Sequence, residues 1–254
     1  MDTLLTAQST PQQQARGLPT ALPRVFMQWR NLLLAHWPIR AALLRALIPR
    51  ELEIDTFDGS AWIGIVPFYL TIRYRGMPFS LSFPEVNVRT YVRHRDLSGV
   101  WFLSLDAHNR LAVATARNHF GLPYHFARMS MQSKTHNGQQ RLCFASERKS
   151  KRNGRANLRL DYGPSGEAYL SRPGTLEYWL TERYRLFAVN RYGQIGIGEI
   201  DHAPWRLQPA TADFEINSML APLGLSAPMA KPLLHFSRRI DAIAWAVEWA
   251  TLHA

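Results

Sequence analysis

LEIDTFDGSAWIGIVPFYL, residues 52–70, decides the fold class of this chain. Two runs rich in apolar side chains flank the dipeptide Asp58-Gly59, and the second run follows the two-residue period of a strand. Asp-Gly is favoured in two-residue hairpin loops, because both central residues of such a turn take positive φ. The stretch therefore predicts an antiparallel hairpin.

Further short strands are predicted along the chain on both sides of a predicted helix. They lie at residues 84–93, 100–107 and 111–117, in a basic hairpin at 141–162, and in a hairpin at 185–200. Many short strands in succession are typical of an antiparallel barrel or sandwich.

Three helices are also predicted, one before these strands, one among them and one after them. Residues 38–48 combine a proline in the first turn, apolar residues at helical spacing and a terminating Pro49. Thr175 can cap a helix within 175–187, and a shorter helix is expected at 214–224. No linker or internal repeat follows residue 23. We therefore expect a loose polar tail at 1–23 and a single α+β domain at 24–254.

Charge and composition limit the function classes. The chain carries 30 Lys and Arg against 19 Asp and Glu, a net charge of +11. Seven basic residues and one acidic residue lie between Arg141 and Arg159, around the turn dipeptide Asn153-Gly154. Aromatic residues do not alternate with these charges, as a single-strand stacking surface would require. Nucleic-acid binding through residues 141–159 is therefore the weakest of the alternatives that we keep.

The compartment is expected to be the cytosol. No apolar run reaches the roughly 20 clean residues of a membrane-spanning helix, and residues 1–23 lack the pattern of a secretory signal. A single cysteine, Cys143, rules out an internal disulfide and is expected to be a buried, inert thiol.

The strand at 84–93 presents a polar face. Alternation places Glu85, Asn87 and Arg89 on one face, with Tyr91 beyond them, and valines on most of the other face. An exposed sheet surface would account for this pattern. In a small closed barrel, however, the same row would line an internal cavity and could bind a small anion.

NHFGLPYHFA, residues 118–127, is the second candidate segment. Gly121 and Pro123 restrict the turn, so Tyr124 and His125 are expected just beyond a strand end. Either side chain could act in acid–base chemistry, or both could simply pack beneath a rigid loop. The histidine spacing does not indicate zinc, and no phosphate-binding loop is present; no cofactor is predicted.

Segments from about Arg24 to Phe236 resemble the YqjF-like family (DUF2071), a bacterial group of unknown function. The resemblance rests on QWRNLLLAHWPI, LRALIPRELEIDTFDGSAWIGIVPF, FPEVNVRTYV, FGLPYHFARM, LEYWLTERYRLF, HAPWRLQ and PLLHF. That family is similar to acetoacetate decarboxylase, so the resemblance implies a conical β-barrel with a few helices packed outside. It also implies that Arg30 and Glu85 correspond to an arginine and a glutamate of the decarboxylase site.

The decarboxylases place two lysines directly after the loop proline, and the first forms a Schiff base with the keto acid. Here those positions are Tyr124 and His125, so the resemblance does not extend to imine chemistry. The leading hypothesis is an internal pocket that binds a small carboxylate or carbonyl compound. Arg30, Asn87 and Arg89 would bind it, and Tyr124, His125 and Glu85 would transfer protons. The sequence leaves open whether the protein is an enzyme or a non-catalytic binder or sensor, and whether it forms homo-oligomers.

Overall fold

A computed structural model describes residues 18–136, 139–150, 154–227 and 230–250 of the chain. Seven strands form a ring in the pairing order β12-β11-β5-β4-β3-β1-β14, and β14 pairs back with β12. Two of these ladders are short, with two residue pairs between β5 and β11 and three between β12 and β14. The ring strands are β1 (Val25–Ile39), β3 (Ala61–Tyr74), β4 (Leu81–His94), β5 (Leu97–Ala107), β11 (Arg185–Val189), β12 (Ile195–His202) and β14 (Leu233–Ala244).

The predicted hairpin turn at Asp58-Gly59 is confirmed. Phe57 and Ser60 pair across it, and Asp58 and Gly59 have φ of 46° and 75°. Positive φ at both central residues is the geometry that favours Asp-Gly at this position. The turn precedes β3, which pairs with β1 on one side and β4 on the other.

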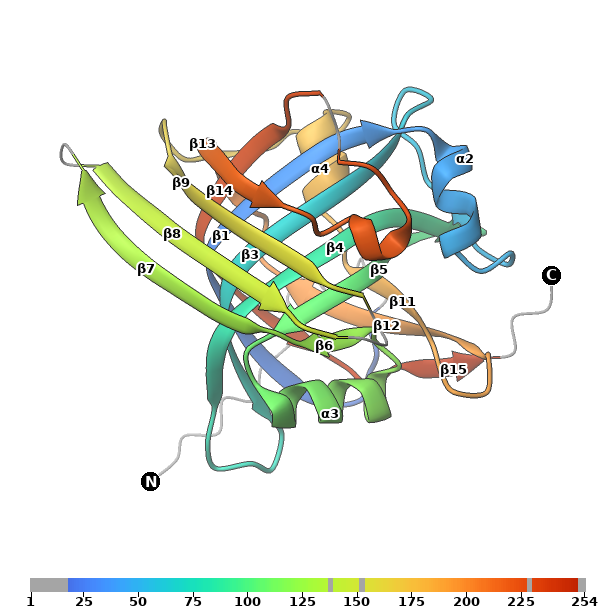
Figure 1. Cartoon of the computed structure of the whole chain (residues 1–254). Coiled ribbons are helices and arrows are strands. Elements are labelled where there is room, and N and C mark those ends of the chain that lie inside the picture. The colour runs from blue at the N-terminus through green and yellow to red at the C-terminus, as the bar shows by residue number, and fades with distance from the viewer. Residues whose placement is uncertain (1–17, 137–138, 151–153, 228–229, 251–254) are drawn as a thin grey trace.

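A second layer of antiparallel strands packs on the outside of the ring (Figure 1). Its connection to the ring is a two-pair ladder between β13 and β14. The layer consists of β7 (Arg128–His136), β8 (Gln139–Arg148), β9 (Ala156–Pro164) and β13 (Arg206–Asn217). Four short strands complete the sheet: β2 (Glu53–Ile54), β6 (Tyr124–Phe126), β10 (Tyr169–Leu170) and β15 (Glu248–Ala250).

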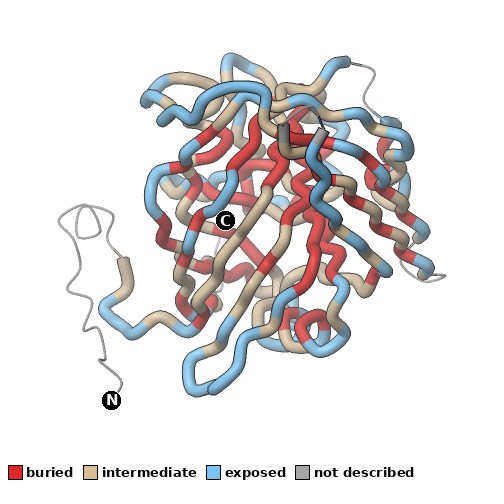
Figure 2. Tube along the Cα trace, turned by 90° about the vertical axis from the view of Figure 1, so that its left-hand side faces the viewer, coloured by how far each residue is buried: buried red, intermediate tan, exposed pale blue. Residues whose placement is uncertain are grey.

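Buried residues lie along the strands (Figure 2), and they form apolar clusters on both faces of the ring. The larger apolar cluster lies between the ring and the second layer and includes Val86 and Val88 of β4 and Phe144 of β8. A smaller cluster lies inside the ring and includes Phe68 and Trp205. The apolar face of β4 therefore packs outward against the second layer, and its polar face points into the ring. The α+β class, mostly antiparallel with few helices, is confirmed.

Residues 111–117 do not form the predicted strand. They lie in the helix α3 (Arg110–Phe120), which the Asn109 side chain caps by accepting a hydrogen bond from the Ala112 N–H. Gly121 ends the helix in the left-handed conformation, with φ of 61°. The alternation of small and apolar residues in this segment is compatible with a strand and with a helix. Alanine favours the helix once both of its ends are capped. In Figure 1, α3 lies across one end of the barrel.

The other helices are near the predicted positions. The segment at 38–48 contains α2 (Ala41–Leu44) and η1 (Arg45–Leu47), but Pro38 belongs to β1. In α4 (Leu176–Thr181), the predicted cap is confirmed, because the Thr175 side chain accepts from the Tyr178 N–H. The prediction at 214–224 was wrong for its first half, which continues β13; only η2 (Ala221–Leu223) is helical.

Three further predictions concern the periphery. Cys143 is not in the core: its side chain lies on the outer face of β8 beside Asp161, whereas Leu142 and Phe144 point inward. The turn residue Asn153 of the basic hairpin and most of the predicted tail, residues 1–17, lie outside the described residues. In the part of the chain that is described, no helix has the length and apolar character needed to span a membrane.

Candidate functional site

The ring encloses a cavity of about 150 Å³. Side chains of all seven ring strands contribute to its lining, together with α3, Leu122 and Tyr124. Most of the lining is aromatic or aliphatic. Polar side chains from β4 form one wall, because Glu85, Asn87 and Arg89 alternate along the inward face of that strand.

Glu85 and Tyr124 meet in this cavity. The Tyr124 hydroxyl lies 3.1 Å from each carboxylate oxygen of Glu85, whose side chain is only 2% exposed. Their backbones are brought together by pairing: Glu85 is opposite Ala107 of β5, and Tyr124 pairs with Leu105 of the same strand in the short parallel ladder of β6. In the segment 118–127 the helix α3 therefore ends, the chain turns at Gly121, and the side chain of Tyr124 points into the cavity.

Burial changes the protonation of this pair. It raises the pKa of the Glu85 carboxyl to about 8, with a further increase from Asp106, while the hydrogen bond from Tyr124 acts in the opposite direction. Burial and the neighbouring Glu85 also raise the pKa of the Tyr124 phenol well above its ordinary value, and that of Tyr74 above its own. At neutral pH the site therefore contains a neutral carboxylic acid beside two neutral phenols.

Arg89 introduces a positive charge on the same inward face of β4, four residues beyond Glu85. Within the described part of the chain, no carboxylate forms an ion pair with Arg89, and its buried Nε has no hydrogen-bond partner. Its guanidinium carbon lies 5.9 Å from the centre of the Tyr91 ring. The buried Oδ1 of Asn87 is also without a partner among the described residues. Two adjacent inward residues of β4 thus have unused hydrogen-bonding groups.

The other two arginines that line the cavity are neutralised. Arg183 contacts Asp55 at 2.7 Å, and Arg185 contacts Glu199 at 2.6 Å. A carboxylate entering the cavity would therefore be attracted to Arg89 rather than to these pairs, because their charges are already balanced.

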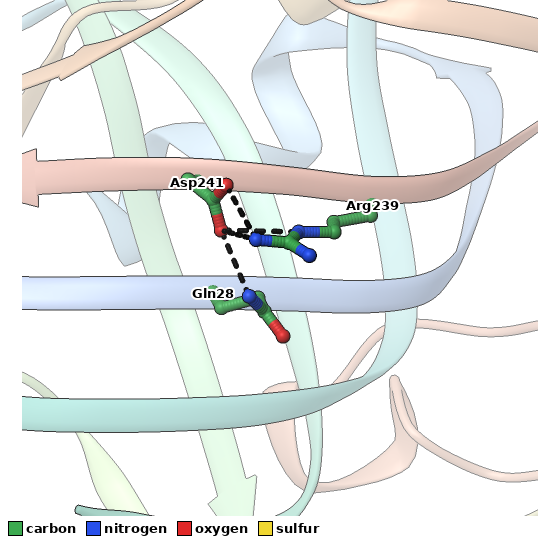
Figure 3. Close-up of polar contacts among 3 residues, drawn as sticks. All are labelled: Gln28, Arg239 and Asp241. Carbon is green, nitrogen blue, oxygen red and sulfur yellow. Dashed lines mark hydrogen bonds and ion pairs between the residues drawn. The ribbon is translucent and has the colours of Figure 1, made fainter.

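Arg30 lies on the other face of the barrel wall. Its Nη2 donates to the Thr71 hydroxyl at 3.2 Å, its guanidinium faces the Tyr69 ring at 5.4 Å, and it is not among the residues that line the cavity. Gln28, two residues earlier, shares this outer face and donates to Asp241, which also binds Arg239 (Figure 3). The structure thus does not bring Arg30 together with Glu85 and Tyr124.

A bulge in β1 explains this placement. Val25, Met27 and Trp29 point inward, but Asn31 adopts φ of 54° and the pairing with β3 shifts register beyond Arg30. After the bulge, the even-numbered Leu32 lines the cavity. Pro49 lies on the far side of this bulge from Arg30. Counting residues back from Pro49 therefore does not predict which way Arg30 points.

His125 also points away from the cavity, because consecutive residues of a strand face opposite sides. Its buried Nδ1 has no partner among the described residues. Burial lowers the pKa of the imidazole to about 4, and nearby Arg148 and Arg117 contribute to the decrease. The imidazole is therefore neutral at physiological pH.

Next to His125, on the side of the second layer, lies an ion pair that the sequence analysis missed. Arg148 of β8 and Asp106 of β5 are 3.2 Å apart, and both side chains are at most 1% exposed. Burial raises the pKa of Asp106 to about 6 against the opposing effect of Arg148. Both residues were visible as charges at the ends of apolar strands, but nothing in the sequence connected them. Asp106 lies behind Glu85 and adds to the increase in its pKa.

Deeper in the ring, the Tyr91 hydroxyl and His36 Nε2 lie 2.8 Å apart, and both side chains are fully buried. Burial lowers the pKa of His36 well below its ordinary value, and Arg89 and His235 act in the same direction. This pair extends the polar row beyond Arg89. Among the described residues, no three His, Cys, Asp or Glu side chains are grouped as metal ligands.

Residues 26–241 match the model of a family described as an uncharacterized conserved protein, DUF2071. The chain belongs to the DUF2071 family. It is 38% identical to the YqjF protein of Bacillus subtilis strain 168 over 238 residues, which are 92% of this chain and 96% of that protein. The predicted resemblance to the YqjF-like family is therefore confirmed.

Solved structures with the same fold belong to acetoacetate decarboxylase-like proteins. An acetoacetate decarboxylase-like enzyme from Sphingomonas wittichii RW1 superimposes with a TM-score of 0.62 at 10% identity, covering 91% of this chain and 94% of that one. The enduracididine biosynthesis enzyme MppR gives 0.65 at 10% identity and 92% coverage of both chains. Acetoacetate decarboxylase from Legionella pneumophila gives 0.55 at 16% identity, covering 92% and 91%. At these identities the likeness establishes the fold alone.

Proposed function

We propose that this protein binds a small carboxylate or carbonyl compound in the barrel cavity and that Glu85 and Tyr124 transfer protons to or from it. The observation that carries the proposal is a neutral, buried Glu85 carboxyl hydrogen-bonded to a phenol, in a cavity that is also lined by an arginine without an acidic partner among the described residues. Such perturbed groups in a cavity are characteristic of functional sites.

Arg89 would bind the carboxylate of the ligand, because a guanidinium offers two parallel N–H donors that match two carboxylate oxygens. Asn87 lies one inward position nearer to Glu85 and can supply a further hydrogen bond. The ligand carboxylate would then balance the charge of Arg89 inside the apolar cavity. Arg89, which lines the cavity, would therefore bind the ligand carboxylate, the role that the sequence had suggested for Arg30.

Glu85 is suited to general acid–base catalysis, since a pKa of about 8 lies near physiological pH. As an acid it can protonate a ligand carbonyl, and as a base it can remove a proton from the carbon next to that carbonyl. Tyr124 holds the carboxyl in place and can donate to the developing oxyanion. Enolisation of a 2-oxo acid requires only these steps. None of the three described lysines lines the cavity, in agreement with chemistry that forms no imine.

The test has two readouts, both with pyruvate as the first probe. Calorimetric titration measures binding, and proton NMR in D₂O measures exchange of the pyruvate methyl protons, which reports enolisation. We expect Arg89→Leu to abolish binding, and Glu85→Gln and Tyr124→Phe to slow exchange by about 100-fold or more. Arg238→Leu, an exposed arginine of β14, is the matched control.

Binding without exchange would show that the site is that of a binder or sensor and would remove the catalytic half of the proposal. Equal binding by wild type and Arg89→Leu would remove the proposal as a whole. Binding of nucleic acid through residues 141–159 receives less support, since Arg141, Lys149 and Arg159 all form ion pairs with acidic side chains.

A further inference from the structure

Part of the cavity wall beside Glu85 is aromatic, because Phe68 of β3 pairs directly with Glu85 of β4 and both line the cavity. It contains three aromatic side chains that contact one another: Trp29 stacks on Trp205 at 5.9 Å between ring centres and meets Phe68 edge-on at 6.4 Å. These rings come from β1, β3 and the segment that precedes β13. They are packed against the interior apolar cluster and give the wall a fixed shape.

We propose that the ligand carries one compact apolar group, of the size of a benzene ring or a branched alkyl chain, beside its carboxylate or carbonyl head. This inference rests on the proposed function, because the head is placed at Arg89 and Glu85. The apolar group would then lie against the wall formed by Trp29, Phe68 and Trp205. The ligand class is therefore a monocarboxylic 2-oxo acid, or a related carbonyl compound, with an aromatic or branched side chain.

The size of the cavity sets the upper limit. A cavity of about 150 Å³ is comparable to an engineered protein cavity that binds benzene. The whole ligand, head and apolar group together, must fit this volume. A 2-oxo acid with one ring comes close to filling it, and one with two fused rings exceeds it. Buried side chains such as Leu32, Val66 and Phe68 hold their part of the wall in place, so the cavity cannot widen there.

The character of the wall sets the other limits. Each CH₂ group buried against the aromatic wall increases the affinity by a factor of about four. A ligand without an apolar group should therefore bind much more weakly than one that has such a group. A second carboxylate at the far end of the ligand would be desolvated without a partner, which excludes dicarboxylates.

Ala116 offers a way to test the placement of the apolar group. This residue of α3 is buried and lines the cavity, together with Phe120 and Leu122 at the end of the helix. A larger side chain at this position would reduce the space in the cavity that is left for the apolar group. Ala114 lies on the exposed face of the same helix and provides a matched control.

The experiment compares three 2-oxo acids with the same head: pyruvate, 4-methyl-2-oxopentanoate and phenylpyruvate. Calorimetric titration of the wild type should show the two larger acids binding more tightly than pyruvate, by about 50-fold or more. Ala116→Phe should remove this advantage, so that the two larger acids bind no more tightly than pyruvate does, whereas Ala114→Phe should bind all three acids as the wild type does. Wild-type protein should not bind 2-naphthylpyruvate, a result that depends on no variant.

The outcomes separate this inference from the proposed function. If pyruvate binds as tightly as phenylpyruvate, and Arg89→Leu abolishes both, the inference is wrong and the proposed function stands. If the larger acids bind but neither Arg89→Leu nor Ala116→Phe changes their affinity, they bind outside the cavity and the inference is again wrong. If no acid of any size binds in a manner that depends on Arg89, both fail.

Discussion

Replacing Glu85 with Gln should remove a large part of the pH dependence of folding stability. The pKa of this carboxyl is about 8 in the folded protein, against an ordinary value of 4.5. Between these values the unfolded chain has released the proton and the folded chain still holds it, so raising the pH favours unfolding. The Glu85 contribution is fully present below about pH 4.5 and is lost as the pH rises toward 8.

The magnitude follows from the difference between the two pKa values. Each pH unit in this window lowers the free energy of unfolding by about 1.4 kcal/mol, so the total approaches roughly 5 kcal/mol at pH 8. Glu85→Gln has no titrating group at this position and should show none of this loss. The free energies of wild type and variant should therefore diverge steadily from pH 5 to pH 8.

Two neighbouring groups also titrate in this range. Asp106, with a pKa of about 6, adds a loss of stability with rising pH, and His125, with a pKa of about 4, adds a gain up to about its ordinary value of 6.5. Both residues are present in wild type and variant. The difference between the two proteins at each pH therefore reports Glu85.

The assay is urea unfolding followed by tryptophan fluorescence at pH 5, 6, 7 and 8. Glu167→Gln, which alters an exposed carboxylate, should follow the wild type at every pH. Parallel curves for wild type and Glu85→Gln would refute the reasoning, because they would mean that Glu85 ionises at the same pH in the folded and unfolded states.

Three further substitutions test the structure around the site, each by the same urea unfolding assay at pH 7. Asp106→Asn should lower the free energy of unfolding by about 3 kcal/mol or more, since it leaves the buried Arg148 without its counter-charge. Gly64→Ala should cost roughly 1–3 kcal/mol, because its Cβ would lie 2.8 Å from the buried ring of His36. Gly121→Ala should cost roughly 2–4 kcal/mol, since its φ is +61° and its Cβ would lie 2.6 Å from a backbone oxygen.

Matched variants check these expectations. Glu215→Gln breaks an exposed ion pair with Arg159 and should change stability by no more than about 1 kcal/mol. Gly193→Ala has a similar positive φ but open space at its Cβ, so it should cost about 1–2 kcal/mol from backbone strain alone. Equal losses at Gly121 and Gly193 would contradict the close approach at Gly121. A fully stable Asp106→Asn protein would contradict the buried ion pair, and a fully stable Gly64→Ala protein the contact with His36.

Local physical chemistry accounts for what the sequence alone could predict. The Asp58-Gly59 turn, the Thr175 cap and the alternation of Glu85, Asn87 and Arg89 on one face of a strand each depend on residues only a few positions apart. The expectation at Tyr124 also needed no structure: the resemblance predicts an amine directly after Pro123, the sequence has a phenol there, and so no imine is predicted at this position.

Only the tertiary structure decided which side of each strand faces the cavity. The polar face of β4 points inward because a second sheet covers its valines, and that sheet is formed by residues at least 35 positions later in the chain. The bulge at Asn31 turns Arg30 outward, and the ion pair of Asp106 with Arg148 joins two strands that are not hydrogen-bonded to each other. The conformational preferences of neighbouring residues determine turns, helix caps and the alternation of side chains along a strand. Which face of a strand points into the cavity depends instead on the layers that pack on either side of it. Those layers are assembled from distant parts of the chain.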